Sequence, residues 1–420
     1  MHINEKLQYR LLQRNIRYSY LDGISYCFMM GVIVPYLGLY ILRFNGPPEL
    51  VSLIVAVQPV VLFVVSLAAA SYVNSFERKK MVTVPFGFMV RLFILFIALI
   101  PFLPEAWRAQ AFFILWALTW VPWGFCSLSW SPMMCNIVPE SQRGTFFGVR
   151  TAMTGISSFL GTLVTGIVLA RFPFLSGFTV LLLISFVCVM ISQYFLSLHM
   201  EPVVAQPGES KRLIRPRAKG LNLIANLQTF QHPEFGRIFS LCCLALFIFH
   251  SGYSMAIPLY TLRQVQQLGF DNGMIALITI AQSLTAFAGS YIGGRGSDRW
   301  GYRYVFLFST MVSVIPPLIW VASSQLPWLV FASMLAGLSG NAYMICFSFM
   351  TLAVSPYEDR SRFLAVNTAV GNLAGTLGPL LGMLLTKLPE VGIEGSLLIS
   401  AGLMLSGALF AFNVAKTGAF

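Results

Sequence analysis

The chain has 420 residues, of which 57% are hydrophobic and only 10% are charged, and its mean hydropathy is +0.76. Soluble domains carry about 25% charged residues, so this composition excludes a water-soluble globular protein and indicates a chain solvated by lipid. The formal net charge of +12 comes from basic residues placed between apolar runs, which is typical of membrane topology signals and not of nucleic-acid binding.

The chain begins with a polar leader, residues 1–17, in which Lys6, Arg10, Arg14 and Arg17 fall on one face of a helix. Such a basic stripe is typical of a helix that lies along an anionic membrane surface. A solvated tail is the alternative interpretation. The apolar run that follows is too long for the hydrophobic region of a signal peptide, so we expect no cleaved signal here.

Twelve apolar runs follow, each long enough to cross a bilayer, which takes roughly 20 helical residues. The predicted spans are 18–43, 49–73, 81–103, 107–137, 143–170, 174–198, 237–262, 273–294, 302–323, 327–353, 362–386 and 394–415. One long polar interruption, residues 199–236, separates the first six spans from the last six. The sequence therefore predicts an all-α membrane protein with two bundles, 18–198 and 237–420, joined by a linker.

The two predicted bundles are related in sequence. At an offset of 224 positions, polar and small residues coincide: Gln58 with Gln282, Ala70 with Gly294, Asn74 with Asp298, and Lys79 with Arg303. At an offset of 217, Pro139-x-x-x-Arg143 matches Pro356-x-x-x-Arg360. Ordered matches of this kind indicate parallel internal repeats.

A polar, glycine-containing hairpin is predicted between the eighth and ninth spans, with the pattern Gly294-x-x-x-Asp298-Arg299-x-Gly301-x-Arg303. This pattern resembles the signature loop of the major facilitator superfamily of transporters. The resemblance implies two pseudo-twofold-related six-helix bundles around a central cavity, lined by spans 1, 4, 7 and 10. The copy in the first half, residues 70–79, departs from the pattern at Asn74 and Glu77.

The resemblance also implies a gate on the cytoplasmic side. Asp298 would face the start of the fifth span, near Arg143 and Arg150, and pair with arginine only when the two bundles close there. A plain topology charge is the alternative. The predicted gating residues are Gly294, Asp298, Arg299, Gly301, Arg303, Arg143 and Arg150.

Few ionisable residues fall inside predicted spans, where each charge costs about 2.5–3.5 kcal/mol at the helix centre. Asp22 is a candidate for proton coupling, or else a structural partner of Arg17 or Arg91. Arg91 either pairs with Asp22 or binds an acidic group of a substrate. His250 either carries a proton or is a hydrogen-bonded cavity residue that never titrates.

An aromatic stripe marks the fourth span, where Trp116, Trp120 and Trp123 recur at helical spacing and Trp130 adds another turn on roughly the same face. The stripe predicts a cavity wall that suits a bulky apolar, aromatic or cationic substrate. Packing against neighbouring helices or lipid is the alternative. The predicted substrate-binding residues are Tyr26, Met30, Arg91, Trp116, Trp120, Trp123, His250, Tyr253 and Asn341.

No catalytic motif, metal-ligand spacing or cofactor-binding loop is found in the sequence, so we expect neither an enzyme nor a cofactor or metal. The predicted function is proton-coupled export of a hydrophobic or amphipathic small molecule by alternating access. A lipid or lysolipid flippase, and a transport-dead sensor or assembly factor on the same scaffold, remain alternatives. We expect a monomer in the plasma membrane with both termini in the cytoplasm, because basic residues concentrate in alternate loops.

Overall fold

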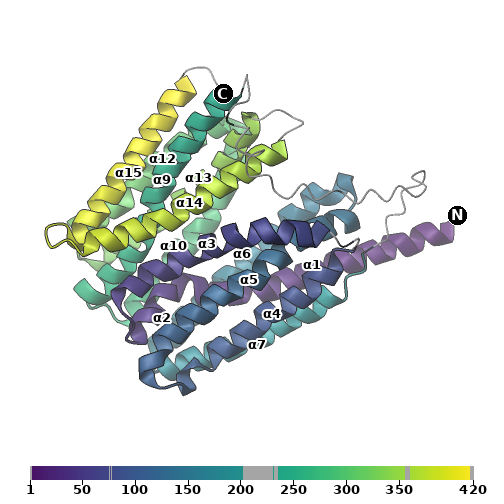
Figure 1. The fold of residues 1–420 in the computed structure, drawn as a ribbon, viewed down its shortest axis with the longest axis horizontal. Coiled ribbons are helices and arrows are strands. Elements are labelled where there is room, and N and C mark those ends of the chain that lie inside the picture. Colours follow the sequence, from purple (N-terminus) through teal and green to yellow (C-terminus); the bar gives the residue numbers. More distant parts are fainter. Residues whose placement is uncertain are drawn as a thin grey trace. The chain divides into compact units, whose positions relative to one another are not determined.

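The structure of the protein is a computed structural model that describes residues 2–74, 76, 78–201, 230, 235–354 and 360–416. Every secondary-structure element within these ranges is helical, and Figure 1 shows how the helices run. Twelve of the described segments are long and apolar enough to cross a membrane. The twelve spans predicted from the sequence are thus confirmed. Most of the predicted linker, 199–236, lies outside the described residues.

The helices alternate with short connections. Those before the linker are α1 (His2–Ile33), α2 (Leu37–Arg43), α3 (Pro48–Asn74), α4 (Lys80–Ala98), α5 (Glu105–Ile137), α6 (Glu140–Arg171) and α7 (Phe174–Ser197). Those after it are α9 (Gly236–Leu262), α10 (Asn272–Tyr291), α11 (Ser297–Trp300), α12 (Tyr302–Ala322), α13 (Leu326–Ala353), α14 (Arg360–Thr386) and α15 (Gly392–Lys416).

The first helix includes the polar leader. Helix α1 runs without a break from His2 to Ile33, so the leader continues into the first span instead of forming a short helix of its own. The chain then makes a 3₁₀ turn over Val34–Tyr36 before α2 begins. Pro35 lies in this turn, and its missing backbone N–H explains why the α-helical pattern is interrupted there.

One compact unit comprises residues 1–35, 61–168 and 172–221. Within it α1 packs against α7, and α4 packs against both α5 and α7 (Figure 1). Helices α1 and α6 approach so closely at Gly161 that a Cβ added there would collide with the carbonyl oxygen of Phe28. Small residues permit such close approach between spanning helices.

A second compact unit comprises residues 36–60, 169–171 and 222–420. Its helices repeat the packing pattern of the first unit: α9 packs against α14 and α15, and α12 packs against α13 and α15. A Cβ on Gly289 of α10 would collide with the carbonyl oxygen of Leu338 in α13. The repeat predicted from the sequence is therefore also a repeat of helix packing.

The glycine-containing segment after α10 is mainly helical, which corrects the predicted hairpin. Helix α10 continues through a π-helical turn over Ile292–Gly296 and then through α11. The Ser297 hydroxyl donates a hydrogen bond to the carbonyl oxygen of Gly293 and so supports this continuation. The chain reverses only at Gly301, whose φ of 88° is a conformation that glycine adopts at little cost.

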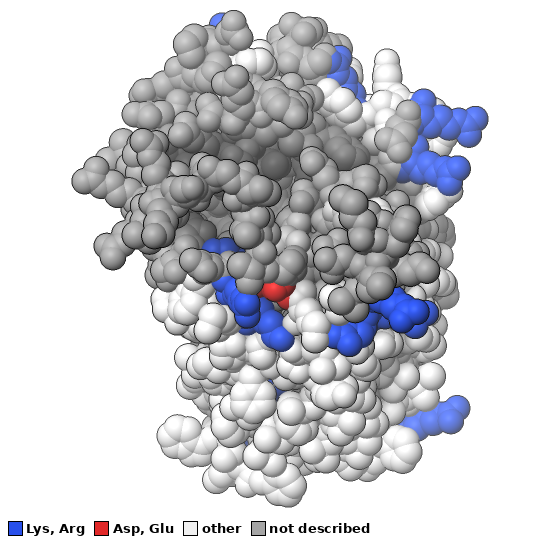
Figure 2. Space-filling view, turned by 90° about the vertical axis from the view of Figure 1, so that its right-hand side faces the viewer, with Lys and Arg blue, Asp and Glu red and all other residues white. Residues whose placement is uncertain are grey.

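Exposed charge on one face of the molecule is mainly basic. Figure 2 shows Lys and Arg side chains on the described part of this face, with little acidic surface visible among them. In the first unit, Arg10, Arg17 and Arg78 are all exposed.

Candidate functional site

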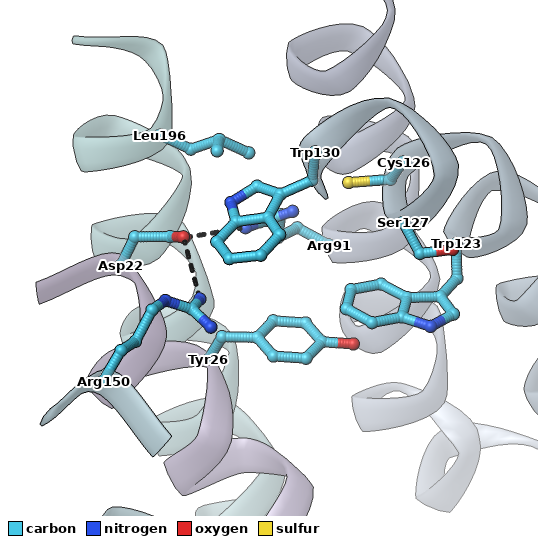
Figure 3. A pocket seen from close by; sticks show the side chains of 9 residues that line it. All are labelled: Asp22, Tyr26, Arg91, Trp123, Cys126, Ser127, Trp130, Arg150 and Leu196. Atoms are coloured by element: carbon cyan, nitrogen blue, oxygen red, sulfur yellow. Dashed lines mark ion pairs between the residues drawn. The ribbon is translucent and has the colours of Figure 1, made fainter. Parts of the chain in front are cut away.

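The first unit contains a cavity of about 210 Å³ to which five helices contribute (Figure 3). Its lining combines charged, aromatic and small side chains: Asp22 and Tyr26 from α1, Arg91 from α4, Trp123, Cys126, Ser127 and Trp130 from α5, Arg150 from α6, and Leu196 from α7. Among these, one carboxylate and two guanidinium groups lie with six other side chains, of which three are aromatic.

Asp22 is the acidic centre of the cavity and is only 5% exposed. Its Oδ1 accepts a hydrogen bond of 2.6 Å from the Ser192 hydroxyl and lies 3.6 Å from Nη2 of Arg91. Its Oδ2 lies 3.7 Å from Nη2 of Arg150. The carboxylate is therefore compensated from two sides, as a buried charge requires.

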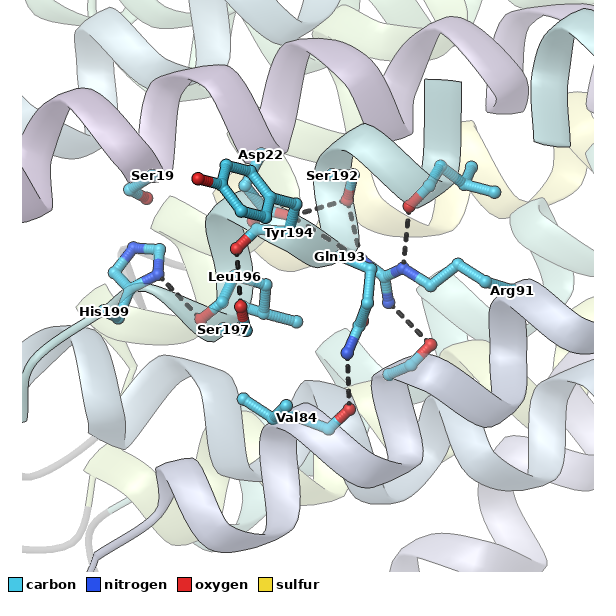
Figure 4. Close-up of polar contacts among 12 residues, drawn as sticks. Ser19, Asp22, Val84, Arg91, Ser192, Gln193, Tyr194, Leu196, Ser197 and His199 are labelled. Carbon is cyan, nitrogen blue, oxygen red and sulfur yellow. Dashed lines mark hydrogen bonds and ion pairs between the residues drawn. The ribbon is translucent and has the colours of Figure 1, made fainter. Parts of the chain in front are cut away.

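Arg91 is almost completely buried, with its side chain 2% exposed. Its guanidinium donates to the carbonyl oxygens of Gly87 (2.7 Å) and Val189 (3.2 Å). It also donates to Oγ of Ser192 (2.6 Å), and Figure 4 shows Arg91 beside Ser192. A Cβ at Gly87 would lie 2.8 Å from Nη1 of Arg91, so glycine leaves the space that the guanidinium occupies. These bonds offset the cost of burying the arginine and fix α4 to α7.

Arg150 is held more loosely, and its side chain is 22% exposed. Its Nε donates to the carbonyl oxygen of Ser19 over 3.4 Å, and its Cζ lies 4.2 Å from the ring centroid of Trp130. This geometry is a cation–π contact. Figure 3 shows the guanidinium beside Asp22 at one side of the cavity.

The tryptophan stripe of α5 divides between cavity and core. Trp123 lines the cavity and stacks on Tyr26, with 4.8 Å between ring centroids and 1° between ring planes. Trp120 meets Trp123 edge-on, but Trp116 and Trp120 are only 1% and 3% exposed and are not part of the lining. The structure thus places Trp123 and Trp130 at the cavity and Trp116 and Trp120 in helix packing.

Two of the predicted residues of the second unit, His250 and Tyr253, lie together with Tyr343. Nδ1 of His250 lies 2.6 Å from the Tyr343 hydroxyl, and its ring stacks against Tyr253 at 6.3 Å. Asn341 donates to the carbonyl oxygen of Ala286 at 3.0 Å, so it joins α13 to α10. Met30, in the first unit, is half-buried and does not line the cavity.

The predicted gating residues are only partly described. The side chains of Arg143 and Asp298 lie outside the described residues. Arg299 is exposed and Arg303 is half-buried, whereas Gly294 has open space where a Cβ would be. Arg150, which the family resemblance assigns to the gate, contacts Asp22.

Ser192 is the main contributor that sequence reasoning missed. It lies in a predicted lipid-solvated span among apolar residues, and a single serine there gives no signal, because serine also occurs routinely in helix packing. Its role follows only from the packing of α7 against α1 and α4, which brings its hydroxyl between Asp22 and Arg91.

Spanning helices in two repeated packing patterns, with a charged cavity inside one of them, define a multi-pass membrane transport protein. The family model of the Major Facilitator Superfamily matches residues 23–265 and 242–418. The chain therefore belongs to this superfamily and is a transporter, not an enzyme.

Beyond the family match, the chain is similar to several individual proteins at low sequence identity. It is 23% identical over 309 residues to the multidrug resistance protein MdtG of Salmonella arizonae, covering 72% of this chain and 71% of the relative. It is 25% identical over 146 residues to a Na⁺, Li⁺, K⁺/H⁺ antiporter of Planococcus maritimus, covering 33% and 34%. The crystal structure of a mutant of the nucleoside transporter NupG superposes with a TM-score of 0.72 at 11% identity, covering 96% of this chain and 99% of NupG.

Proposed function

We propose that this protein is a proton-coupled secondary active transporter that exports a hydrophobic or amphipathic organic molecule by alternating access. The observation that carries the proposal is the cavity of the first unit, where a buried carboxylate lies between two arginines and beside aromatic rings. The names of two relatives, a multidrug resistance protein and a cation/H⁺ antiporter, support export and proton coupling respectively.

Asp22 is the proposed proton-coupling residue. Its carboxylate attracts Arg91 of α4 and Arg150 of α6 and accepts a hydrogen bond from Ser192 of α7. Protonation would remove the charge that attracts both arginines, and so weaken the links from α1 to α4 and α6. A ligand or proton shifts a conformational equilibrium when it interacts differently with the two states. Protonation of Asp22 can therefore bias the exchange between inward-open and outward-open forms.

The aromatic lining is the proposed contact surface for the apolar part of the substrate. Tyr26 and Trp123 present stacked rings, and Trp130 adds a third ring to the lining. Aromatic rings offer a large apolar area with few rotatable bonds. This surface supports a substrate with a ring or a short apolar body, and it gives few hydrogen-bond partners for a sugar.

Transport assays in proteoliposomes test the proposal. We expect Asp22→Asn to lose accumulation driven by a pH gradient while retaining counterflow of labelled substrate, because exchange needs no net proton movement. Asp271→Asn is a matched control: Asp271 is an exposed N-cap of α10, and asparagine caps a helix equally well.

Three other results would contradict parts of the proposal. Unchanged gradient-driven accumulation in Asp22→Asn would place proton coupling elsewhere. Absence of counterflow in the wild type, with substrate binding retained, would favour the sensor, and movement of a fluorescent lysolipid alone would favour a flippase. If Asp22→Asn does not fold, the double variant with Arg91→Gln answers the same question without leaving Arg91 uncompensated.

We also infer that the basic face belongs to the cytoplasm, together with both termini. The exposed Arg10, Arg17 and Arg78 support this orientation, because cytoplasmic loops carry an excess of Lys and Arg. A cysteine introduced at position 78 should react with an impermeant reagent in inside-out vesicles only. Reaction in intact cells would reverse the orientation.

A further inference from the structure

The transport function proposed above does not specify the charge of the substrate. The residues that line the cavity indicate what this charge is. We propose that the cavity selects an amphipathic organic anion, whose acidic group binds the guanidinium of Arg150 and whose apolar part lies against Tyr26, Trp123 and Trp130. This inference depends on the proposed transport function for its biological meaning, but its binding step can be measured separately.

The charge of the cavity favours an anion. Two arginines and one aspartate line it, and the other lining residues are neutral. With all three groups ionised, the lining carries one uncompensated positive charge. A monoanion would neutralise the site, whereas a cation would add to the imbalance in an environment where water screens charges poorly.

Of the two arginines, Arg150 is the one that has donors available. Arg91 is 2% exposed and already donates to two carbonyl oxygens and to Ser192. Arg150 is 22% exposed, makes one long hydrogen bond of 3.4 Å within the described part of the chain, to Ser19, and lies 3.7 Å from Asp22, beyond direct hydrogen-bond length. Its planar fork matches the geometry of a carboxylate, which can accept two parallel hydrogen bonds.

The surroundings of Arg150 fix where such a ligand would lie. The Cζ atom of Arg150 lies 4.2 Å from the ring centroid of Trp130, so this ring packs against the guanidinium. Figure 3 shows Asp22 and Arg150 at one side of the cavity and Trp123 at the other, with the rings of Trp130 and Tyr26 between them. The cavity is therefore amphipathic in the same sense as the proposed ligand, with its acid-binding end at Arg150.

The size of the cavity limits the ligand further. An engineered protein cavity of about 150 Å³ binds benzene. The cavity of about 210 Å³ is larger by the volume of a small substituent. A single aromatic ring with one acidic group is the simplest ligand that matches both the volume and the two ends of the site.

Three probes of nearly equal shape isolate the charge of the ligand: benzoate, uncharged benzamide and cationic benzylamine. Binding to the full-length purified protein at neutral pH is followed by quenching of tryptophan fluorescence and by titration calorimetry. We expect benzoate to bind about tenfold or more tightly than either of the others, because charge-assisted bidentate hydrogen bonds are stronger than neutral ones.

Variants of Arg150 locate the acid-binding group. Arg150→Gln should weaken benzoate binding by about tenfold or more and change benzamide binding by less than about threefold. Arg150→Lys should retain part of the preference for benzoate, since it keeps the charge but loses the fork. Arg78→Gln is the matched control, since Arg78 is exposed and does not line the cavity, and it should leave all three affinities unchanged.

Two results of the binding measurements would overturn the inference: equal or tighter binding of benzamide or benzylamine by the wild type, or unchanged benzoate binding in Arg150→Gln. The comparison of probes in the wild type stands even if an Arg150 variant does not fold. Counterflow with each labelled probe separates this inference from the transport function. Counterflow of benzamide or benzylamine without benzoate would overturn only the inference, whereas no counterflow of any small molecule, hydrophobic dyes included, would overturn the transport function.

Discussion

The two units contain the same helix packing around different polar centres. In the first unit, Asp22 on α1 meets two arginines and a serine. In the second unit, His250 on α9, the helix that corresponds to α1, meets the hydroxyl of Tyr343 and the ring of Tyr253. A centre with a carboxylate and two guanidinium groups can respond to a proton or an ionic ligand through full charges, whereas a centre of one histidine and two tyrosines offers hydrogen bonds and ring surface. The repeat therefore fixes the framework, and substitutions at a few buried positions fix the chemistry.

The largest loss of stability should come from removing one charged side chain of the centre around Asp22. Arg91→Met removes a buried guanidinium and leaves Asp22 with Arg150 at 3.7 Å as its cationic partner. Removing one member of a buried ion pair costs about 3–5 kcal/mol, and we expect a loss of this order in the free energy of unfolding in detergent. Adding Asp22→Asn to this variant should restore part of the loss. A cost below about 1 kcal/mol for Arg91→Met would show that Asp22 does not depend on Arg91 for compensation.

A loss of stability of intermediate size, in both units, should come from substitutions at the close helix contacts that the two units have in common. A Cβ at Gly161 or at Gly289 would collide with a carbonyl oxygen of the neighbouring helix, so Gly161→Ala and Gly289→Ala should each lower stability by about 1–3 kcal/mol. Gly148, on the same helix as Gly161, has nothing within 4 Å of its Cβ position. Gly148→Ala should leave thermal stability unchanged or raise it, since alanine favours the helix. Similar melting temperatures for the two α6 variants would contradict the close approach of α1 and α6.

The smallest loss of stability should come from a substitution in the second unit, at the contact between His250 and Tyr343. Tyr343→Phe removes the hydroxyl that lies 2.6 Å from Nδ1 of His250, and a neutral hydrogen bond contributes about 0.5–1.5 kcal/mol. Thermal unfolding should therefore separate this variant clearly from Arg91→Met. A loss as large as that of Arg91→Met would mean that His250 carries a charge, and the contrast between the two units would then disappear.

The fold was largely predictable from the sequence because lipid imposes a simple rule on spanning helices. Apolar runs of sufficient length mark all twelve spans, and matched residues such as Gln58 and Gln282 revealed the repeat. The segment after α10 was predicted wrongly as a hairpin. Its glycines suggested a turn, but the hydrogen bond from Ser297 to Gly293 continues the helix to Trp300, and only Gly301 reverses the chain.

The candidate site was less predictable because it depends on which helices meet. Pairing of Asp22 with Arg91 was one of two alternatives, since both stood out as charges within apolar spans, and the structure forms it. The contact of Arg150 with Asp22 was not foreseen, because family symmetry directed attention to Asp298. Helical spacing placed the tryptophans of α5 on one face, but it could not tell that Trp116 packs in the core while Trp123 lines the cavity.

The hydrogen bonds around Arg91 have a mechanical consequence. Arg91 of α4 donates to Val189 of α7 at 3.2 Å, and Gln193 of α7 donates back to Val84 of α4 at 2.9 Å. An axial shift of one helix against the other by a single residue, about 1.5 Å, would change the length and the angle of both bonds and so weaken them. We therefore expect α4 and α7 to move together, whereas α5, which lines the same cavity, contains Pro122 and Pro132, and each proline removes a backbone hydrogen bond and gives the helix a place to bend.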